Sequence, residues 1–323
     1  MCTAVSLNSR HHYFGRNLDL EYDIAEQICI TPRCYPFRFR HQNSILNHYA
    51  MIGTAIVADD YPLYFDAVNE EGLCAAGLNF PNNAVYHSMD PQRCNIASFE
   101  VIPWILSQCK TVSHVKLLLQ ETQVTDDPFR KDVMTTPLHW IISDATESIV
   151  LESMANGMHI HQNPYGVLTN NPPFDFHCYN MANYGHLTAQ QAENTFSRSL
   201  PVQSYSNGMG SIGLPGDLSS ASRFVRASFM KEHSLGGSVE QDITQFFHIL
   251  DSVAMPKGSV ITPDGRYEFT RYSSCCDTVS GKYFYKTYED SRISFIDLHA
   301  ADLESAQLQY WPMLHDAVFF QQS

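Results

Sequence analysis

Short apolar runs separated by polar turns dominate the first third of the chain and predict a series of β-strands. The expected strands cover 2–7, 12–18, 26–31, 49–58, 63–68 and 73–79. Asn8, Ser9 and Arg10 separate the first two runs and predict a hairpin turn. Continuous apolar runs of this length are typical of strands that are covered on both faces.

The apolar spacing then becomes helical, with Ile102, Ile105 and Leu106 on one face of a helix that begins near Ser98. Further helices are expected at 113–120, 222–233 and 239–254, and further strands at 138–143, 148–153, 166–169, 267–275, 282–287 and 293–298. Loops are expected at 124–137, which contains two prolines, and at 171–220, which is rich in Pro, Asn, Gly and Ser.

The predicted elements follow the order strands, two helices, strands, two helices, strands. Antiparallel sheets layered with helices, an α+β fold, fit this order better than a βαβ alternation does. The chain has no internal repeat and no Gly/Ser-rich linker. Residues 1–323 are therefore expected to form one domain.

Composition and charge exclude several classes of partner. The 323 residues carry a net charge of −14 with no cluster of Lys and Arg, which argues against nucleic acid and anionic membranes. No apolar run is long enough to span a membrane, and we expect no secretory signal, because charged and polar residues interrupt the first segment. The nine cysteines form no C-x-x-C pair, so we expect reduced thiols in a cytoplasmic protein.

Two motifs that could bind a cofactor or a metal are interpreted as structural. Residues 208–213 fit G-x-G-x-x-G, but the preceding segment is polar and Pro215 follows where a helix should begin. The histidine pairs at 11–12 and 159/161 lack the ligands that would complete a metal site. We therefore expect neither a cofactor nor a metal.

Cys2 is the first candidate for chemistry, because it directly follows the initiator methionine. Removal of Met1 would leave one residue with a thiol and a free α-amine, whose reference pKa values are about 8.5 and about 7.7–8.0. An N-terminal amine can act as the base for its own side chain. On residue type alone, the interpretation of Cys2 as a small apolar residue near a chain end is favoured.

Two asparagines and an arginine stand at positions where a cleft could form. Asn79 and Asn170 each end a predicted strand two residues before a proline. Their amides could form turns, or could donate hydrogen bonds to an oxyanion. Arg223 lies in the first turn of a serine-capped helix, where a cation opposes the helix dipole, which suggests an anionic or carbonyl partner outside the helix.

Arg16 and Asp19 close the opening segment. On a regular strand, Arg16 and Leu18 would share one face and Asp19 would lie on the other. Both can serve one site only if the strand bends or ends there.

Together these segments resemble the choloylglycine hydrolase family of linear amide C–N hydrolases, within the N-terminal nucleophile hydrolases, and are most similar to bile salt hydrolases. The matching segments run in family order through nearly the whole chain: MCTA at 1–4, YFGRNLD at 13–19, DYP at 60–62, GLNFP at 77–81, LHW at 138–140, GVLTN at 166–170, GLPGD at 213–217, SRF at 222–224 and QFFHIL at 245–250.

The resemblance implies an αββα sandwich and a catalytic set. Cys2 would be the nucleophile, with its own amine as base once Met1 is removed. Arg16 and Asp19 would hold the thiol and the amine in place. The other members implied are the oxyanion-site asparagines Asn79 and Asn170, and Arg223, which would organise the polar cluster.

The resemblance also implies conjugated bile salts as substrates and a homotetramer assembled through the 187–207 segment. Leu18, Phe65, Phe129 and Val133 are the apolar residues expected to contact a flat steroid, although loop packing would explain Phe129 and Val133 equally well. Penicillin V acylases share all six catalytic positions, so a penicillin V acylase or another acyl-amide hydrolase remains the alternative. A binder that keeps the fold without catalysis is a third hypothesis. At Tyr22–Ile24 the chain departs from its relatives, which leaves the shape of the pocket open.

Overall fold

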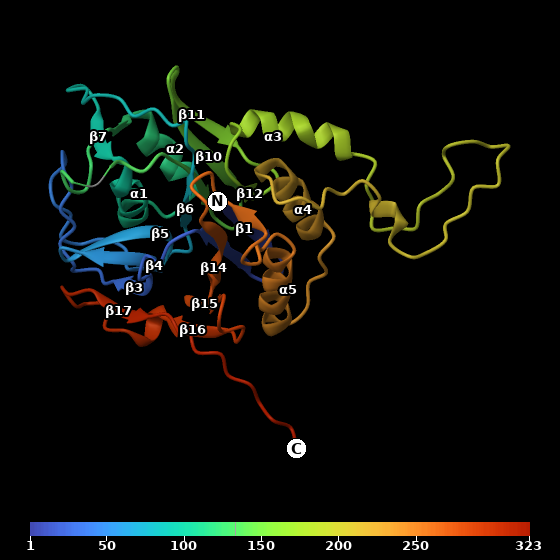
Figure 1. The fold of residues 1–323 in the computed structure, drawn as a ribbon. Coiled ribbons are helices and arrows are strands. Elements are labelled where there is room, and N and C mark those ends of the chain that lie inside the picture. Colours follow the sequence, from blue (N-terminus) through green and yellow to red (C-terminus); the bar gives the residue numbers. More distant parts are fainter. Residues whose placement is uncertain (133) are drawn as a thin grey trace.

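Two antiparallel β-sheets lie face to face in the computed structural model, which describes residues 1–132 and 134–323 (Figure 1). Helices α1 and α2 cover the outer face of one sheet, and α4 and α5 cover the outer face of the other. The expected α+β fold with helix, sheet, sheet and helix layers is confirmed.

The first sheet has seven strands, which carry Cys2, Arg16 and Asp19 of the predicted catalytic set. Its order is β12-β1-β2-β14-β15-β16, with β13 paired to β14. The bounds are β1 (Cys2–Asn8), β2 (His12–Leu20), β12 (Val167–Leu168), β13 (Val260–Ile261), β14 (Tyr267–Asp277), β15 (Lys282–Thr287) and β16 (Ser294–Asp297). Strand β1 is therefore interior to the sheet, although it begins at the second residue of the chain.

The second sheet has eight strands in the order β11-β10-β9-β6-β5-β4-β3-β17. Its bounds are β3 (Gln27–Thr31), β4 (Met51–Ala58), β5 (Tyr61–Asn69), β6 (Cys74–Asn79), β9 (Leu138–Ser143), β10 (Ser148–Met154), β11 (Gly157–Gln162) and β17 (Gln309–Pro312). A separate parallel pair is β7 (Cys94–Ala97) and β8 (Thr122–Thr125).

The side chains of β6 explain why its sequence is apolar without alternation. Ala76 and Leu78 pack in the core between the sheets, whereas Ala75 packs in the second core beneath α1. Both faces of the strand are covered, as the continuous apolar runs predicted.

The helices are α1 (Val101–Gln108), α2 (Val112–Gln120), α3 (Phe174–Met181), α4 (Ser220–Glu232) and α5 (Val239–Asp251). Helix α4 begins at a serine cap, as predicted, with the Ser219 hydroxyl accepting from the Ser222 amide. No helix in the described ranges combines the length and apolar character needed to cross a membrane.

The prediction of a loop through all of 171–220 is wrong at its start. Helix α3 begins directly after Pro173, and it buries Phe174 and His177 on its inner face. Proline is compatible with the first turn of a helix. The Pro-rich composition therefore led to a loop prediction at a place where a helix begins.

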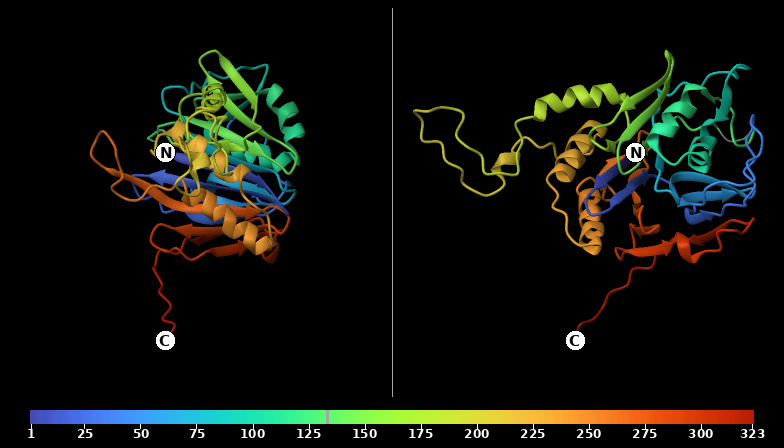
Figure 2. Two further views of the ribbon diagram at one scale, coloured as in Figure 1. Left: turned by 90° about the vertical axis from the view of Figure 1, so that its right-hand side faces the viewer. Right: turned by 180° about the vertical axis from the view of Figure 1, so that it is seen from behind.

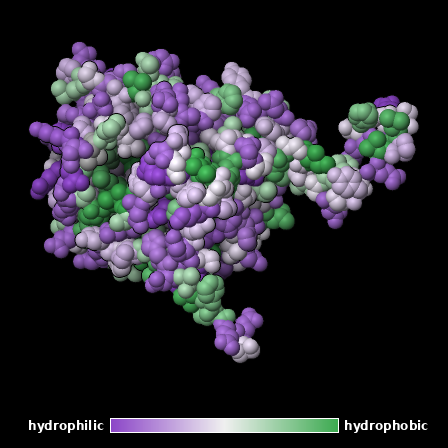
Figure 3. Space-filling model, in the orientation of Figure 1, coloured by the Kyte–Doolittle hydropathy of each residue, from purple (hydrophilic) through white to green (hydrophobic). Residues whose placement is uncertain are grey.

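The rest of that segment projects away from the body of the protein between α3 and α4 (Figures 1 and 2). Apolar side chains of this segment are exposed, with Phe196 at 83% and Tyr205 at 85%. Figure 3 shows apolar residues on the projecting part. This projecting arm, residues 187–207, buries little of its own apolar surface within one chain.

Candidate active site

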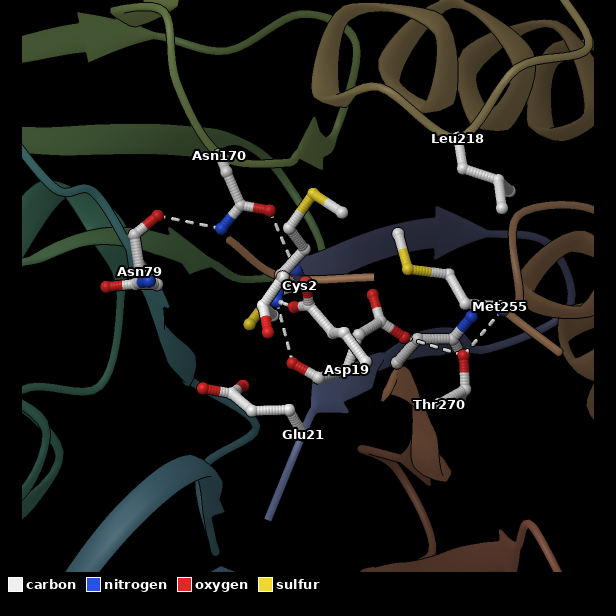
Figure 4. A network of polar contacts seen from close by, with 12 residues as sticks. Cys2, Asp19, Glu21, Asn79, Asn170, Leu218, Met255 and Thr270 are labelled. Carbon is white, nitrogen blue, oxygen red and sulfur yellow. Dashed lines mark hydrogen bonds and ion pairs between the residues drawn. The ribbon is translucent and has the colours of Figure 1, made fainter. Parts of the chain in front are cut away.

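The six predicted catalytic residues come from five separate parts of the chain, and Figure 4 shows Cys2, Asp19, Asn79 and Asn170 of this set close together at the start of β1. Cys2 begins β1 and lies opposite Leu18 of β2, which also contributes Arg16 and Asp19. The other three stand at the ends of elements, Asn79 at the end of β6, Asn170 just after β12, and Arg223 in the first turn of α4. Strand ends and a helix start therefore converge on a buried cysteine that is 3% exposed.

The Asn170 amide links three of these elements. Its Oδ1 accepts from the Cys2 amide nitrogen at 2.7 Å and from Arg223 Nη2 at 2.9 Å. Its Nδ2 donates to the backbone carbonyl of Asn79 at 2.7 Å, which leaves one amide hydrogen for another acceptor. The side chain of Asn79 itself is exposed.

Arg223 has the carbonyl partners that its position at a helix start predicted. Its fully buried guanidinium donates to the carbonyl of Cys2 at 2.5 Å, to Thr3 Oγ1 at 2.6 Å and to the carbonyl of Leu218 at 3.1 Å. Burial lowers the pKa of Arg223, because its contacts are mostly neutral groups. The arginine fixes the backbone of the nucleophile from the helix side.

Met1 occupies the space beside the nucleophile. Its α-ammonium donates to the carbonyl of Asp19 at 2.7 Å and forms an ion pair with Glu268. Burial lowers the pKa of this ammonium, although the charges of Cys2 and Asp19 oppose the shift. In this form the Cys2 nitrogen is part of a peptide bond, so it carries no lone pair that could take a proton.

The two carboxylate oxygens of Asp19, which lies beside this terminus, differ in their hydrogen bonding. Its Oδ1 accepts from Thr270 Oγ1 at 2.6 Å, whereas its buried Oδ2 has no hydrogen-bond partner among the described residues. A buried carboxylate oxygen without a donor is costly, so an additional donor would stabilise this arrangement.

Arg16 approaches the site from the sheet interface. Its Nη1 donates to the carbonyls of Phe65 at 2.9 Å and Gly77 at 2.6 Å, which are in β5 and β6. The next residue, Asn17, reaches Leu250 on α5, so the side chains of β2 alternate between faces as predicted. A bulge in β14 lies opposite Leu18 and Asp19, and β2 ends at Leu20, which allows both faces to border one site.

The predicted steroid contacts divide into two groups. Leu18 is buried opposite Cys2, and Phe65 lies on β5, over which apolar residues reach the surface (Figure 3). Phe129 instead packs against Phe99 and Tyr61, with ring centroids 5.3 and 5.9 Å apart. Val133 lies outside the described residues.

Sequence reasoning missed Glu268 and Thr270, which contact Met1 and Asp19 from β14. No local pattern distinguishes them, because their role depends on pairing between β14 and a strand about 250 residues earlier. It also assigned no role to His139, although the quoted segment 138–140 contains it.

A polar cavity of about 440 Å³ lies at the other end of β1, where Ser6 and Ser9 line it. Cys2 is not among its lining residues, so it is separate from the cluster described above. Within 1–132 and 134–323, no group of three or more His, Cys, Asp or Glu side chains is arranged to hold a metal ion.

Comparison with known proteins agrees with this geometry. The model of the linear amide C–N hydrolases, choloylglycine hydrolase family, matches residues 2–310. This chain belongs to the choloylglycine hydrolase family. It is 46% identical to a bile salt hydrolase/transferase of Lactiplantibacillus plantarum over 99% of each chain.

Solved structures agree with the family assignment. A mutant of the conjugated bile acid hydrolase from Clostridium perfringens aligns over the full length of both chains with a TM-score of 0.92 and 33% identity. A penicillin V acylase from Agrobacterium tumefaciens shares the fold, with a TM-score of 0.76 and 22% identity over 97% of this chain and 91% of the acylase.

Proposed function

We propose that this protein hydrolyses the amide bond that joins a bile acid to glycine or taurine, with Cys2 as the nucleophile. The observation that carries the proposal is the pair of hydrogen bonds that Asn170 Oδ1 accepts from Cys2 and Arg223. That contact supports the proposal, because it links the Asn170 amide and the Arg223 cation to the backbone of the first cysteine of the chain. The names of the full-length relatives support bile salts as the substrate class.

Removal of Met1 activates the site in this proposal. Cleavage of the Met1–Cys2 bond converts the Cys2 amide into a primary amine with additional hydrogens. Asp19 Oδ2, which has no donor among the described residues, would accept one of them, while Asn170 Oδ1 keeps the other. The amine then has a lone pair and can act as the base.

The reaction follows in two halves. The Cys2 amine takes the thiol proton, and the thiolate adds to the amide carbonyl. Asn79 and Asn170 donate to the resulting oxyanion, and the ammonium returns the proton to the leaving nitrogen as the C–N bond breaks. Water, deprotonated by the same amine, then attacks the thioester and releases the bile acid and the thiol. Arg16 and Arg223 act by holding the carbonyl groups around the thiol in place.

Leu18, Phe65, Phe129 and Val133 are proposed as apolar contacts for the steroid. The chain is proposed to work as one domain in a cytoplasmic homotetramer, with the projecting arm in the subunit contacts. Exposed aromatic side chains on that arm support this assembly, because the free energy falls when a second chain covers exposed apolar side chains.

Turnover of glycocholate, taurocholate and penicillin V, measured side by side on protein of confirmed N-terminal mass, tests the substrate class. Bile salt hydrolysis well above penicillin V hydrolysis is expected, and the reverse order would favour an acylase. Tight binding of bile salt without turnover by protein that lacks Met1 would favour a binder. Adding a second amino acid and searching for its bile acid amide tests whether the thioester is also transferred to amines.

A further inference from the structure

A fully buried histidine connects the segments that carry the two asparagines. His139, on β9, directs its Nε2 toward the carbonyl of Thr169 at 2.9 Å. Its ring also stacks on Phe80, with centroids 4.2 Å apart and planes 5° from parallel. Thr169 directly precedes Asn170 and Phe80 directly follows Asn79, so one imidazole contacts both neighbours of the asparagine pair.

The second ring nitrogen of His139 faces another acceptor. Its Nδ1 lies 3.1 Å from Oε1 of Glu152, which is also fully buried, on the adjacent strand β10. A carbonyl and a carboxylate can only accept, so the ring satisfies both contacts only when both nitrogens carry protons. The geometry therefore describes a histidine held between a backbone carbonyl and a carboxylate.

Glu152 is itself fixed by groups other than His139. Its Oε1 accepts from the Phe174 amide at 3.0 Å, and its Oε2 lies 3.4 Å from His161, whose other nitrogen faces Asp175 at 3.2 Å. Burial alone would raise the pKa of Glu152, but the two histidines outweigh it and lower the pKa to about 2. The carboxylate is thus ionised across the neutral range.

Another buried histidine, on α3, contacts Asn170 itself. The Nε2 of His177 donates to the carbonyl of Asn170 at 2.9 Å, and its ring stacks on Phe224 at 4.7 Å. Phe224 directly follows Arg223. The backbone of Asn170 is therefore fixed by histidines on two elements, β9 and α3.

We propose that His139 and Glu152 form a positioning pair that fixes Asn79 and Asn170 in the geometry needed to bind the oxyanion. The inference rests on the proposed function, because it concerns how that function's oxyanion site is held. Neither residue touches the thiol, so both act through the asparagine segments.

Stability alone does not explain a buried histidine–carboxylate pair at this place. Apolar side chains of similar volume commonly stabilise a protein at least as well as a buried ion pair does. An apolar residue at 139 could stack on Phe80, but it could not also hold the carbonyl of Thr169. The pair holds the ends of two strands from different sheets, β6 and β12, at a fixed separation.

Kinetics of His139→Gln, Glu152→Gln and the double variant test the proposal. The expected result is a kcat lowered by about ten- to hundredfold, less than the roughly 10²–10³ for outright loss of an oxyanion donor, with KM within about twofold. Because the two residues act as a unit, the double variant should lose no more than the single variants. His12→Gln is the matched control, since His12 is also buried but contacts Ser6 and Ser143, near the other end of β1.

Phe80→Leu adds a variant that buries no new polar group, and its fold is checked by urea denaturation. It should lower kcat with KM nearly unchanged, because the ring of His139 loses its stacking partner. The proposal is overturned if folded His139→Gln and Glu152→Gln keep kcat within about twofold, or if His12→Gln lowers kcat equally. The unaltered enzyme's turnover of glycocholate separates this outcome from failure of the proposed function.

Discussion

The amide nitrogen of Cys2 donates to Oδ1 of Asn170 at 2.7 Å, across 168 residues of sequence. The contact joins the first residue of β1 to a residue two positions after the end of its neighbour β12. Since Asn170 also contacts Asn79 and Arg223, displacement of this one side chain would disturb the nucleophile, its neighbouring asparagine and the cation together.

Asn170→Ala should lower kcat by about 10²–10³, because it removes an oxyanion donor and the acceptor for the Cys2 nitrogen. Asn171→Ala is the matched control, since that amide donates to the carbonyl of Pro81 and not to Cys2. Steady-state hydrolysis of glycocholate by both variants provides the measurement. Equal kcat values for the two would argue against the proposed role of Asn170.

Cys2→Ser should reduce turnover by at least about 10³, because a hydroxyl is a far weaker nucleophile than a thiol at neutral pH. Release of glycine or taurine should remain near background in protein whose mass shows that Met1 is absent. Cys34→Ser, at a half-buried cysteine whose thiol lies near Glu304, should retain activity. Full turnover by Cys2→Ser would exclude the thiol mechanism.

Arg223→Lys and Arg226→Lys separate catalysis from stability within one helix. Arg226 bonds to the carbonyls of Ser252 and Pro215, whereas Arg223 reaches Cys2. Arg223→Lys should cost about 2–4 kcal/mol of unfolding free energy and also lower kcat, because lysine cannot reproduce the planar set of donors. Arg226→Lys should lower only stability. Urea denaturation and kinetics on the same samples distinguish them.

His12 should make stability depend on pH below neutrality. Burial lowers the pKa of His12 from 6.5 to about 4, so between these values the unfolded chain binds more protons than the native protein. Unfolding free energy should therefore fall as pH decreases from 6.5 to 4, by up to about 1.4 kcal/mol per unit from this residue. Urea denaturation at pH 7 and pH 5 should show a smaller decrease for His12→Gln than for the unaltered protein. Equal decreases for His12→Gln and the unaltered protein would contradict the lowered pKa of His12.

Replacing Phe196 and Tyr205 with serine in the projecting arm should lower the oligomeric state if the arm makes subunit contacts. Light scattering after size-exclusion chromatography gives the mass directly. Leu235→Ser is a suitable control, because Leu235 is 87% exposed but lies in the connection between α4 and α5. An unchanged mass in the double variant would remove the arm from the assembly.

Local patterns predicted most strands and helices, because periodicity and caps such as Ser219 act over a few residues. Family resemblance predicted the layered fold, which the structure confirmed, but the contacts of Glu268 and His139 could not be predicted. Both depend on register between strands that are distant in sequence, and register is set by the assembled sheet. The helix at 174–181 escaped prediction because prolines precede it.

The same strand order has a consequence for protein synthesis. β1 pairs with β12 and β2, and β2 pairs with β14, which begins at Tyr267. At 5–20 residues per second, the ribosome needs roughly 15–50 s after making Cys2 to complete these neighbours. In the folded chain Cys2 is 3% exposed and the Met1 terminus is held by Asp19 and Glu268, so an aminopeptidase that removes Met1 would reach it most easily within that interval. Under the proposed mechanism, fast translation or early folding would therefore raise the fraction of chains that keep Met1 and stay inactive.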